Sequence, residues 1–148
     1  MIVEENIELL QRAWAAYDGG DEEGFAACLT PDWREYGPAG PSGGGGATLE
    51  DERRTMRLHR EAFPDKHTEI HRIVASETVV ACHCTVMATH AGPYLDLEPT
   101  GKKVAVHEMM FNEVRDGRLA VTWAMSSGGG FYEQIAGRAR PAGLDNLG

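Results

Sequence analysis

Glu108 is the residue whose surroundings point most directly to chemistry, because the sequence predicts that it lies on the buried side of a β-sheet. Asp116-Gly117, between two runs rich in β-branched and aromatic residues, is typical of a two-residue hairpin turn. Counting outward from this turn pairs Glu108 with Met125 on a largely apolar row. Burial raises the pKa of a carboxyl group above its usual value of about 4.3, which suits a general base or acid near neutral pH.

The predicted row contains ten residues from the two strands of this hairpin. The same count pairs Val114 with Leu119, Asn112 with Val121, Met110 with Trp123, and Val106 with Ser127. The opposite, more polar side then carries His107, Met109, Phe111, Glu113, Thr122 and Ser126. Three other interpretations of Glu108 remain open: it lies at the rim of the sheet, it pairs with an arginine, or a β-bulge reverses the register.

His59 is the second candidate, on a predicted helix where it shares a face with Met56 and Phe63. Such a histidine is either a core residue with one satisfied hydrogen bond or a proton carrier at the mouth of a pocket. Cys82-His83-Cys84 does not predict a metal site, because alternation in a strand points His83 away from both cysteines. The sequence carries no phosphate loop or dinucleotide fingerprint, so we expect chemistry without a metal or cofactor.

Helices are expected in the first half of the chain. The apolar spacing between Val3 and Tyr17 predicts a first helix, which Asp18-Gly19-Gly20 ends. Asp21 is placed to cap a short second helix that ends at Thr30-Pro31. A capping box formed by Thr48 and Asp51 predicts a third helix that ends at Phe63, while the glycine-rich residues 37–46 predict a loop.

Strands are expected in the second half, at residues 67–74, 78–90, 102–114 and 118–127, followed by a short helical turn at 131–136. Helices followed by a strand meander predict an α+β fold. We expect residues 1–136 to form one domain and residues 137–148 to form a disordered tail.

Composition limits the partners of this domain. The 148 residues are 42% apolar, which is enough for a single core, and the formal net charge is −9. Such an acidic chain without a basic cluster is not expected to bind nucleic acid or a membrane. Three cysteines do not form a disulfide framework, and the acidic N-terminus lacks the positive start of a signal peptide, so we expect a cytoplasmic protein.

A series of short motifs resembles the SnoaL-like polyketide cyclase family, within the nuclear transport factor 2-like fold. In chain order these motifs are Phe63-Pro64-Asp65, Thr89-His90-Ala91-Gly92, Pro99-Thr100-Gly101, Arg115-Asp116-Gly117-Arg118-Leu119, Trp123 and Gln134-Ile135. The resemblance covers about residues 6 to 136 and includes Trp33–Gly37. It implies a cone-shaped curved sheet of four to six strands, mixed or antiparallel, wrapped around three N-terminal helices and enclosing an apolar pocket.

The resemblance also implies intramolecular aldol closure of a polyketide-like substrate without a cofactor. A base removes a proton next to a carbonyl group, and an acid protonates the new alkoxide. The family's acid–base aspartate follows the tryptophan by four residues, and here that position is Ser127. We therefore expect Glu108 to have taken over proton transfer, Ser127 to orient substrate or water, and His59 or Tyr36 to act as a donor; at Tyr36 many relatives carry histidine or asparagine.

The expected substrate is a small hydrophobic or aromatic carbonyl compound of secondary metabolism. The residues expected to bind it are Trp14, Tyr17, Trp33, Tyr36, Met56, Phe63, Cys84, Met110 and Trp123. Two alternatives stay open: a non-catalytic small-molecule binding protein, and a hydratase or epoxide-opening enzyme in which Glu108 activates water. Apolar side chains on the outer face of the sheet, together with the resemblance, also predict a homodimer.

Overall fold

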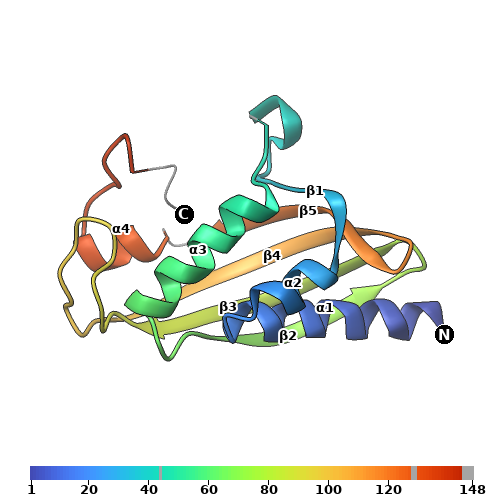
Figure 1. Cartoon of the computed structure of the whole chain (residues 1–148), viewed down its shortest axis with the longest axis horizontal. Helices are drawn as coiled ribbons and strands as arrows, with labels where there is room; N and C mark the ends of the chain where they lie inside the picture. The colour runs from blue at the N-terminus through green and yellow to red at the C-terminus, as the bar shows by residue number, and fades with distance from the viewer. Residues whose placement is uncertain (44, 128–129, 145–148) are drawn as a thin grey trace.

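The computed structural model describes residues 1–43, 45–127 and 130–144 and forms one mixed sheet with helices packed on it. The strand order is β1-β5-β4-β3-β2, where only β1 and β5 run parallel. The strands are β1 (Leu29–Tyr36), β2 (His67–Ala75), β3 (Val79–Thr89), β4 (Lys103–Arg115) and β5 (Arg118–Ser127). Figure 1 shows α1 (Ile2–Asp18), α2 (Glu22–Ala27) and α3 (Leu49–Ala62) over one face of this sheet, with α4 (Phe131–Ala136) beside one end. The predicted α+β class is confirmed.

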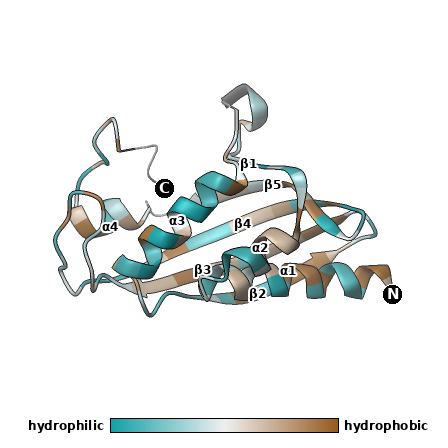
Figure 2. Cartoon of the chain, in the orientation of Figure 1, coloured by the Kyte–Doolittle hydropathy of each residue, from teal (hydrophilic) through white to brown (hydrophobic). Residues whose placement is uncertain are grey.

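The helices form for local reasons that the sequence shows. α1 buries Leu9, Leu10 and Ala13 against the sheet. The Asp21 side chain accepts a hydrogen bond from the Gly24 amide and caps α2. Thr48 and Asp51 form the predicted capping box at the start of α3. Figure 2 shows hydrophilic residues over much of α3, in which Met56 and Ala62 are the buried residues.

The second helix is shorter than predicted, because a fifth strand follows it. α2 ends at Ala27, and the chain from Leu29 enters β1 instead of continuing as a helix to Thr30. Pro31 is tolerated because β1 is an edge strand whose register shifts between Leu29 and Arg34. The four predicted strands and the helical turn at 131–136 are confirmed, with bounds that differ by a residue or two.

The predicted hairpin turn is confirmed, but the register of β5 is wrong beyond its first pairs. Asp116 and Gly117 both have positive φ, 53° and 71°, as a type I′ turn requires. Val114 pairs with Leu119 as expected, but Glu113 pairs with Val121, so Ala120 forms a bulge. All later partners shift by one: Asn112 pairs with Thr122, Met110 with Ala124, Glu108 with Ser126 and His107 with Ser127.

After the bulge, each side chain of β5 points to the side of the sheet opposite to the predicted one, whereas the side chains of β4 point as predicted. Glu108 and Met110 keep the helix-covered side because β3 pairs them with the buried Cys84 and Cys82. Trp123 and Met125 instead pair with the exposed Phe111 and Met109, and therefore leave the row on which Glu108 lies. Thr122 and Ala124 take their place beside the cavity.

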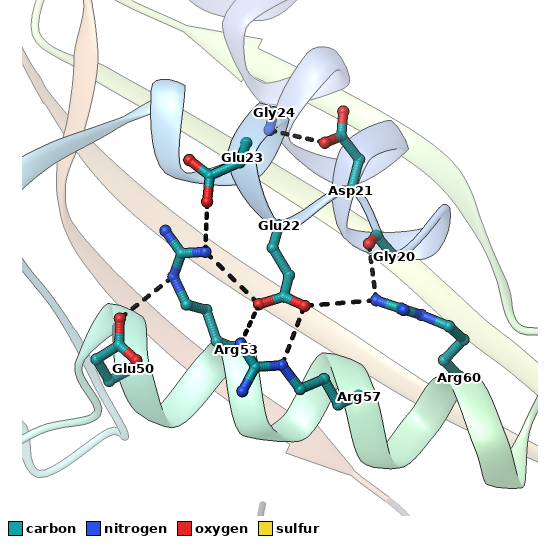
Figure 3. Close-up of polar contacts among 9 residues, drawn as sticks. All are labelled: Gly20, Asp21, Glu22, Glu23, Gly24, Glu50, Arg53, Arg57 and Arg60. Atoms are coloured by element: carbon teal, nitrogen blue, oxygen red, sulfur yellow. Dashed lines mark hydrogen bonds and ion pairs between the residues drawn. The ribbon is translucent and has the colours of Figure 1, made fainter.

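An ion-pair network fixes α3 against α2 (Figure 3). The Glu22 carboxylate lies 2.7 Å from Nη2 of Arg57 and 3.5 Å from guanidinium nitrogens of both Arg53 and Arg60. The Arg60 guanidinium also donates to the Gly20 carbonyl, and Arg53 pairs with Glu23 and Glu50. Because these contacts fix the rotation of α3 about its axis, they also fix the direction of Glu52 and His59, which line the cavity described below.

Candidate functional site

A cavity of about 670 Å³ lies between the helices and the covered face of the sheet. Its size falls within the range of small-molecule sites, about 300–1,000 Å³. Aromatic and aliphatic side chains form most of its wall, and the loop 37–40 with Gly46 and Ala47 contributes to it. Gly40 has a φ of 61° and lies against the Trp123 ring, where a Cβ atom would come within 2.6 Å of Cζ3. A side chain at position 40 would therefore displace this loop.

Glu108 lies on the cavity wall, as the sequence predicts. Burial raises the pKa of its carboxyl group, and the charges of Glu52 and Asp18 raise it further. Lys66 acts in the opposite direction and favours the ionised form. Glu108 is thus a partly buried carboxyl group whose ionised form Lys66 stabilises, which is the kind of environment in which general bases are found.

Two further carboxyl groups share this cavity. Glu35, on β1, has its pKa raised to about 8 by burial and by the charges of Glu52 and Glu108. Glu52, on α3, has its pKa raised by burial, although it accepts a hydrogen bond of 2.9 Å from the Tyr17 hydroxyl. Tyr17 remains protonated because burial and Glu52 raise its pKa. Three acidic groups therefore occupy a largely apolar space.

Lys66 is the cation that faces these acids. Its side chain is 6% exposed, its Nζ atom lies 4.0 Å from Oδ1 of Asp18, and it stacks 4.2 Å from the centre of the Tyr17 ring. Burial lowers the pKa of Lys66, whereas Asp18, Glu52 and Glu108 raise it. Asp18 is itself held by the amide and hydroxyl of Thr68, so the position of Lys66 is fixed by α1 and β2.

His59 lies at another part of the cavity wall, among the rings of Phe63, Tyr94 and Phe131 at centroid distances of 5.5, 5.9 and 5.5 Å. Its Nδ1 atom is buried and has no hydrogen-bond partner among the described residues. Burial lowers the pKa of His59 to about 3, so the imidazole is neutral at physiological pH. This neutral ring is not an imidazolium acid, and it shapes an aromatic end of the cavity.

A hydrogen-bonded chain of polar side chains supports the wall below β1. The Trp33 indole donates to the Thr122 hydroxyl at 3.0 Å, Thr122 donates to Oδ1 of Asn112 at 2.7 Å, and Asn112 donates to the Val80 carbonyl at 3.2 Å. Each group in this chain is buried and paired, which makes it rigid. These hydrogen bonds require the Thr122 side chain to face inward, and this requirement accounts for the register of β5 after the bulge.

The predicted site residues fall into three groups. Glu108 and His59 line the cavity together with Trp14, Tyr17, Trp33, Tyr36 and Met110. The remaining predicted pocket residues are not among those that line it: Met56, Phe63 and Cys84 are buried core residues, and Trp123 packs on Tyr36 at a centroid distance of 5.4 Å. The backbone of Ser127 pairs with His107, but its side chain lies outside what the structure describes.

Sequence reasoning missed Glu35, Glu52 and Lys66. Glu52 was detectable, because it precedes Met56 by four residues on the apolar face that also carries His59. Glu35 follows the buried Trp33 by two residues, so it shares the inward face of β1, but that strand was itself missed. Lys66 gives no local signal, since only the folded chain brings it to Asp18 and Tyr17.

Neither a metal site nor a membrane span emerges from the described part of the chain. No group of three or more His, Cys, Asp or Glu side chains there is arranged to hold a metal ion. Cys82 and Cys84 are buried on the covered side of β3, and His83 is exposed on the other. No helix among residues 1–43, 45–127 and 130–144 is long and apolar enough to cross a membrane.

A mixed sheet covered by helices, with an interior cavity that carries ionisable groups, defines the cone-shaped nuclear transport factor 2-like class. Residues 7–135 match the model of the family described as SnoaL-like polyketide cyclase. The chain belongs to this family, as the motifs predicted. A search of curated protein sequences finds no significant match.

Solved structures share this fold. A putative hydroxylase, AclR from Streptomyces galilaeus, is 25% identical with a TM-score of 0.78 and covers 96% of this chain and 87% of its own. TsrD from Streptomyces laurentii is 22% identical with a TM-score of 0.73, and the match covers 89% of this chain and 95% of TsrD. IdmH from Streptomyces antibioticus, a putative polyketide cyclase, is 24% identical with a TM-score of 0.70, and the match covers 82% of this chain and 91% of IdmH. The last two likenesses support the fold alone.

Proposed function

We propose that the protein is a cofactor-independent cyclase or isomerase that acts by acid–base chemistry on a polyketide-like or other hydrophobic carbonyl compound. The observation that carries this proposal is the Glu108 carboxyl group on the wall of a largely apolar cavity, with its pKa raised by burial and its ionised form favoured by the charge of Lys66. Membership of a polyketide cyclase family supports the reaction type, and secondary metabolism is the corresponding role.

The proposed reaction begins when the Glu108 carboxylate takes a proton from carbon next to a carbonyl group, leaving an enolate. The enolate carbon attacks a second carbonyl carbon of the same molecule, which forms the ring bond and an alkoxide. The aromatic wall around Trp14 and Tyr17 holds the substrate folded, so the two reacting carbons meet at high effective concentration. A cavity of low polarity strengthens each hydrogen bond to the developing charge.

Product analysis with a defined probe tests this function. The probe is a diketone with a phenyl group on one carbonyl carbon, a methyl group on the other and three methylene groups between them. Attack of the methyl-derived enolate carbon on the phenyl ketone closes a six-membered ring. We expect the protein to accelerate closure, detected by chromatography with mass spectrometry as a new peak of unchanged mass or one that has lost water. A product that has gained water would indicate a hydratase. Binding without turnover would indicate a small-molecule carrier, and either result would overturn the cyclase proposal.

Lys66→Met should move the acid limb of the pH–rate profile for this probe to higher pH. Lys66 is the cation that favours ionised Glu108, whereas Glu52 and Asp18 oppose ionisation. Without Lys66 the pKa of Glu108 rises further, so a smaller fraction of the base is active at pH 7 and activity recovers at higher pH. Lys103→Met changes an exposed lysine on the same sheet and should leave the profile in place. An acid limb that Lys66→Met does not move would contradict this electrostatic role.

We also propose that two copies pair through the outer face of the sheet. Val74, Met109, Phe111 and Met125 are 58, 55, 60 and 55% exposed there, an unusually apolar group for a surface in water. Size-exclusion chromatography with light scattering should give twice the mass of one chain, and Phe111→Glu should reduce it to one. A single-chain mass for the unmodified protein at micromolar concentration would remove this proposal.

A further inference from the structure

Glu35 has the position of a second reacting group in the proposed cyclase. Its backbone is fixed by a pair of hydrogen bonds with Ala47, of 3.0 Å from the Glu35 amide and 2.8 Å to the Glu35 carbonyl. Its carboxyl group lines the cavity and makes no hydrogen bond to another described residue. The backbone is therefore held while the acidic group stays available to a ligand.

Burial raises the pKa of both Glu35 and Glu108, but the charge of Lys66 opposes the shift at Glu108 alone of the two. Burial, Glu52 and Glu108 all favour the neutral form of Glu35 and hold its pKa at about 8. Glu108 experiences the same desolvation but has Lys66 to favour its ionised form. β5 separates their strands, so the two groups reach the cavity from different places on its wall. Two carboxyl groups of this kind form an acid and a base in one site.

Three other proton-bearing groups in the cavity, His59, Tyr17 and Lys66, are less suited to the task. The neutral His59 ring would have to lose its remaining proton. The Tyr17 hydroxyl already donates to Glu52, and its pKa is raised well above the usual value. Lys66 is paired with Asp18.

We propose that Glu35 is the general acid of the proposed cyclisation, donating its proton to the alkoxide that ring closure produces. Glu108 gains the proton from the substrate carbon, the enolate electron pair forms the ring bond, and the electron pair of the second carbonyl becomes the alkoxide. Glu35 then loses a proton to this oxygen. Transfer of the proton from Glu108 back to Glu35 through the cavity restores the starting state, so the reaction is a net isomerisation.

The test separates proton removal from ring closure with the phenyl diketone in D₂O. Deuterium uptake next to the carbonyl groups, measured by mass spectrometry, reports the Glu108 step, and formation of the cyclic product reports the complete reaction. We expect Glu35→Gln to keep deuterium uptake at the level of the unmodified protein and to lower ring closure on the order of 10²-fold. Glu35→Asp should restore part of the closure rate. Thermal unfolding of both variants checks that each is folded.

Each other outcome overturns the assignment in a recognisable way. Closure at the unmodified rate in a folded Glu35→Gln protein would show that Glu35 donates no proton. Equal loss of uptake and closure would place Glu35 at the first step and not at the alkoxide. An unmodified protein that gives neither uptake nor closure would overturn the proposed function, and this inference with it, whereas closure that depends on Glu108 alone would overturn the inference and leave the function intact.

Discussion

Glu108→Gln should lower the rate of ring closure by about 10²- to 10⁴-fold, the range that a general base contributes. Glutamine keeps the size of the side chain and its hydrogen-bonding capacity, but it cannot accept a proton from carbon. Deuterium uptake should fall together with closure, because both need the enolate. The variant should remain folded, since the substitution removes an ionisable group whose burial is unfavourable in its charged form.

A matched control for this variant lies on the same strand. Glu113 is exposed on the outer side of β4, so Glu113→Gln makes the same chemical change outside the cavity. It should retain the unmodified rate of closure and of deuterium uptake. A Glu108→Gln protein that is folded and cyclises as fast as Glu113→Gln would remove Glu108 from the mechanism.

Glu35→Gln should make the protein more stable at alkaline pH relative to the unmodified chain. The pKa of Glu35 is about 8 in the folded protein, whereas its ordinary value, which applies in the unfolded chain, is 4.5. Below pH 4.5 the group is protonated in both states. Between these pH values the unfolded chain releases the proton more readily, so the contribution of Glu35 to the free energy of unfolding falls as pH rises. Above pH 8 this loss reaches on the order of 5 kcal/mol, and glutamine removes it.

Urea unfolding at pH 5, 7 and 9 measures this difference. The stability gap between Glu35→Gln and the unmodified protein should widen steadily with pH. Glu52 and Glu108 also have raised pKa values, so both proteins should keep some pH dependence. Glu98→Gln, an exposed position between β3 and β4, should follow the unmodified protein at each pH. A gap that is constant from pH 5 to 9 would show that Glu35 is not buried in an environment that favours its neutral form.

The parts of the fold that the sequence predicted are those fixed by local pattern. The capping box of Thr48 and Asp51 and the turn at Asp116-Gly117 depend on neighbouring residues, and both are present. Alternation along β4 placed Glu108 on the covered side because that strand pairs regularly with β3. The cone-shaped sheet and its cavity were predicted from the resemblance of the motifs to a known family.

The features that were missed depend on residues far apart in the chain. β1 pairs with β5, about 90 positions later, and its Pro31 argues locally for a break. The bulge at Ala120 places Thr122 beneath the Trp33 indole, a contact between residues 89 apart, and nothing in Leu119-Ala120-Val121 indicates it. Glu35 and Lys66 acquire their electrostatic roles only when β1, α1 and β2 surround the same space.

The bulge at Ala120 determines whether the cavity is empty or filled by a side chain of β5. With regular pairing from the turn, the same amino acids would point Trp123 toward the helices beside Met110, and a large indole would occupy the interior. Because Ala120 is unpaired, the Trp123 indole instead lies on the outer face of the sheet, where it packs against Tyr36. The space for a ligand in this protein thus depends on a register shift of one residue between β4 and β5. The hydrogen bonds from Trp33 to Thr122 and from Thr122 to Asn112 hold the two strands in this shifted register.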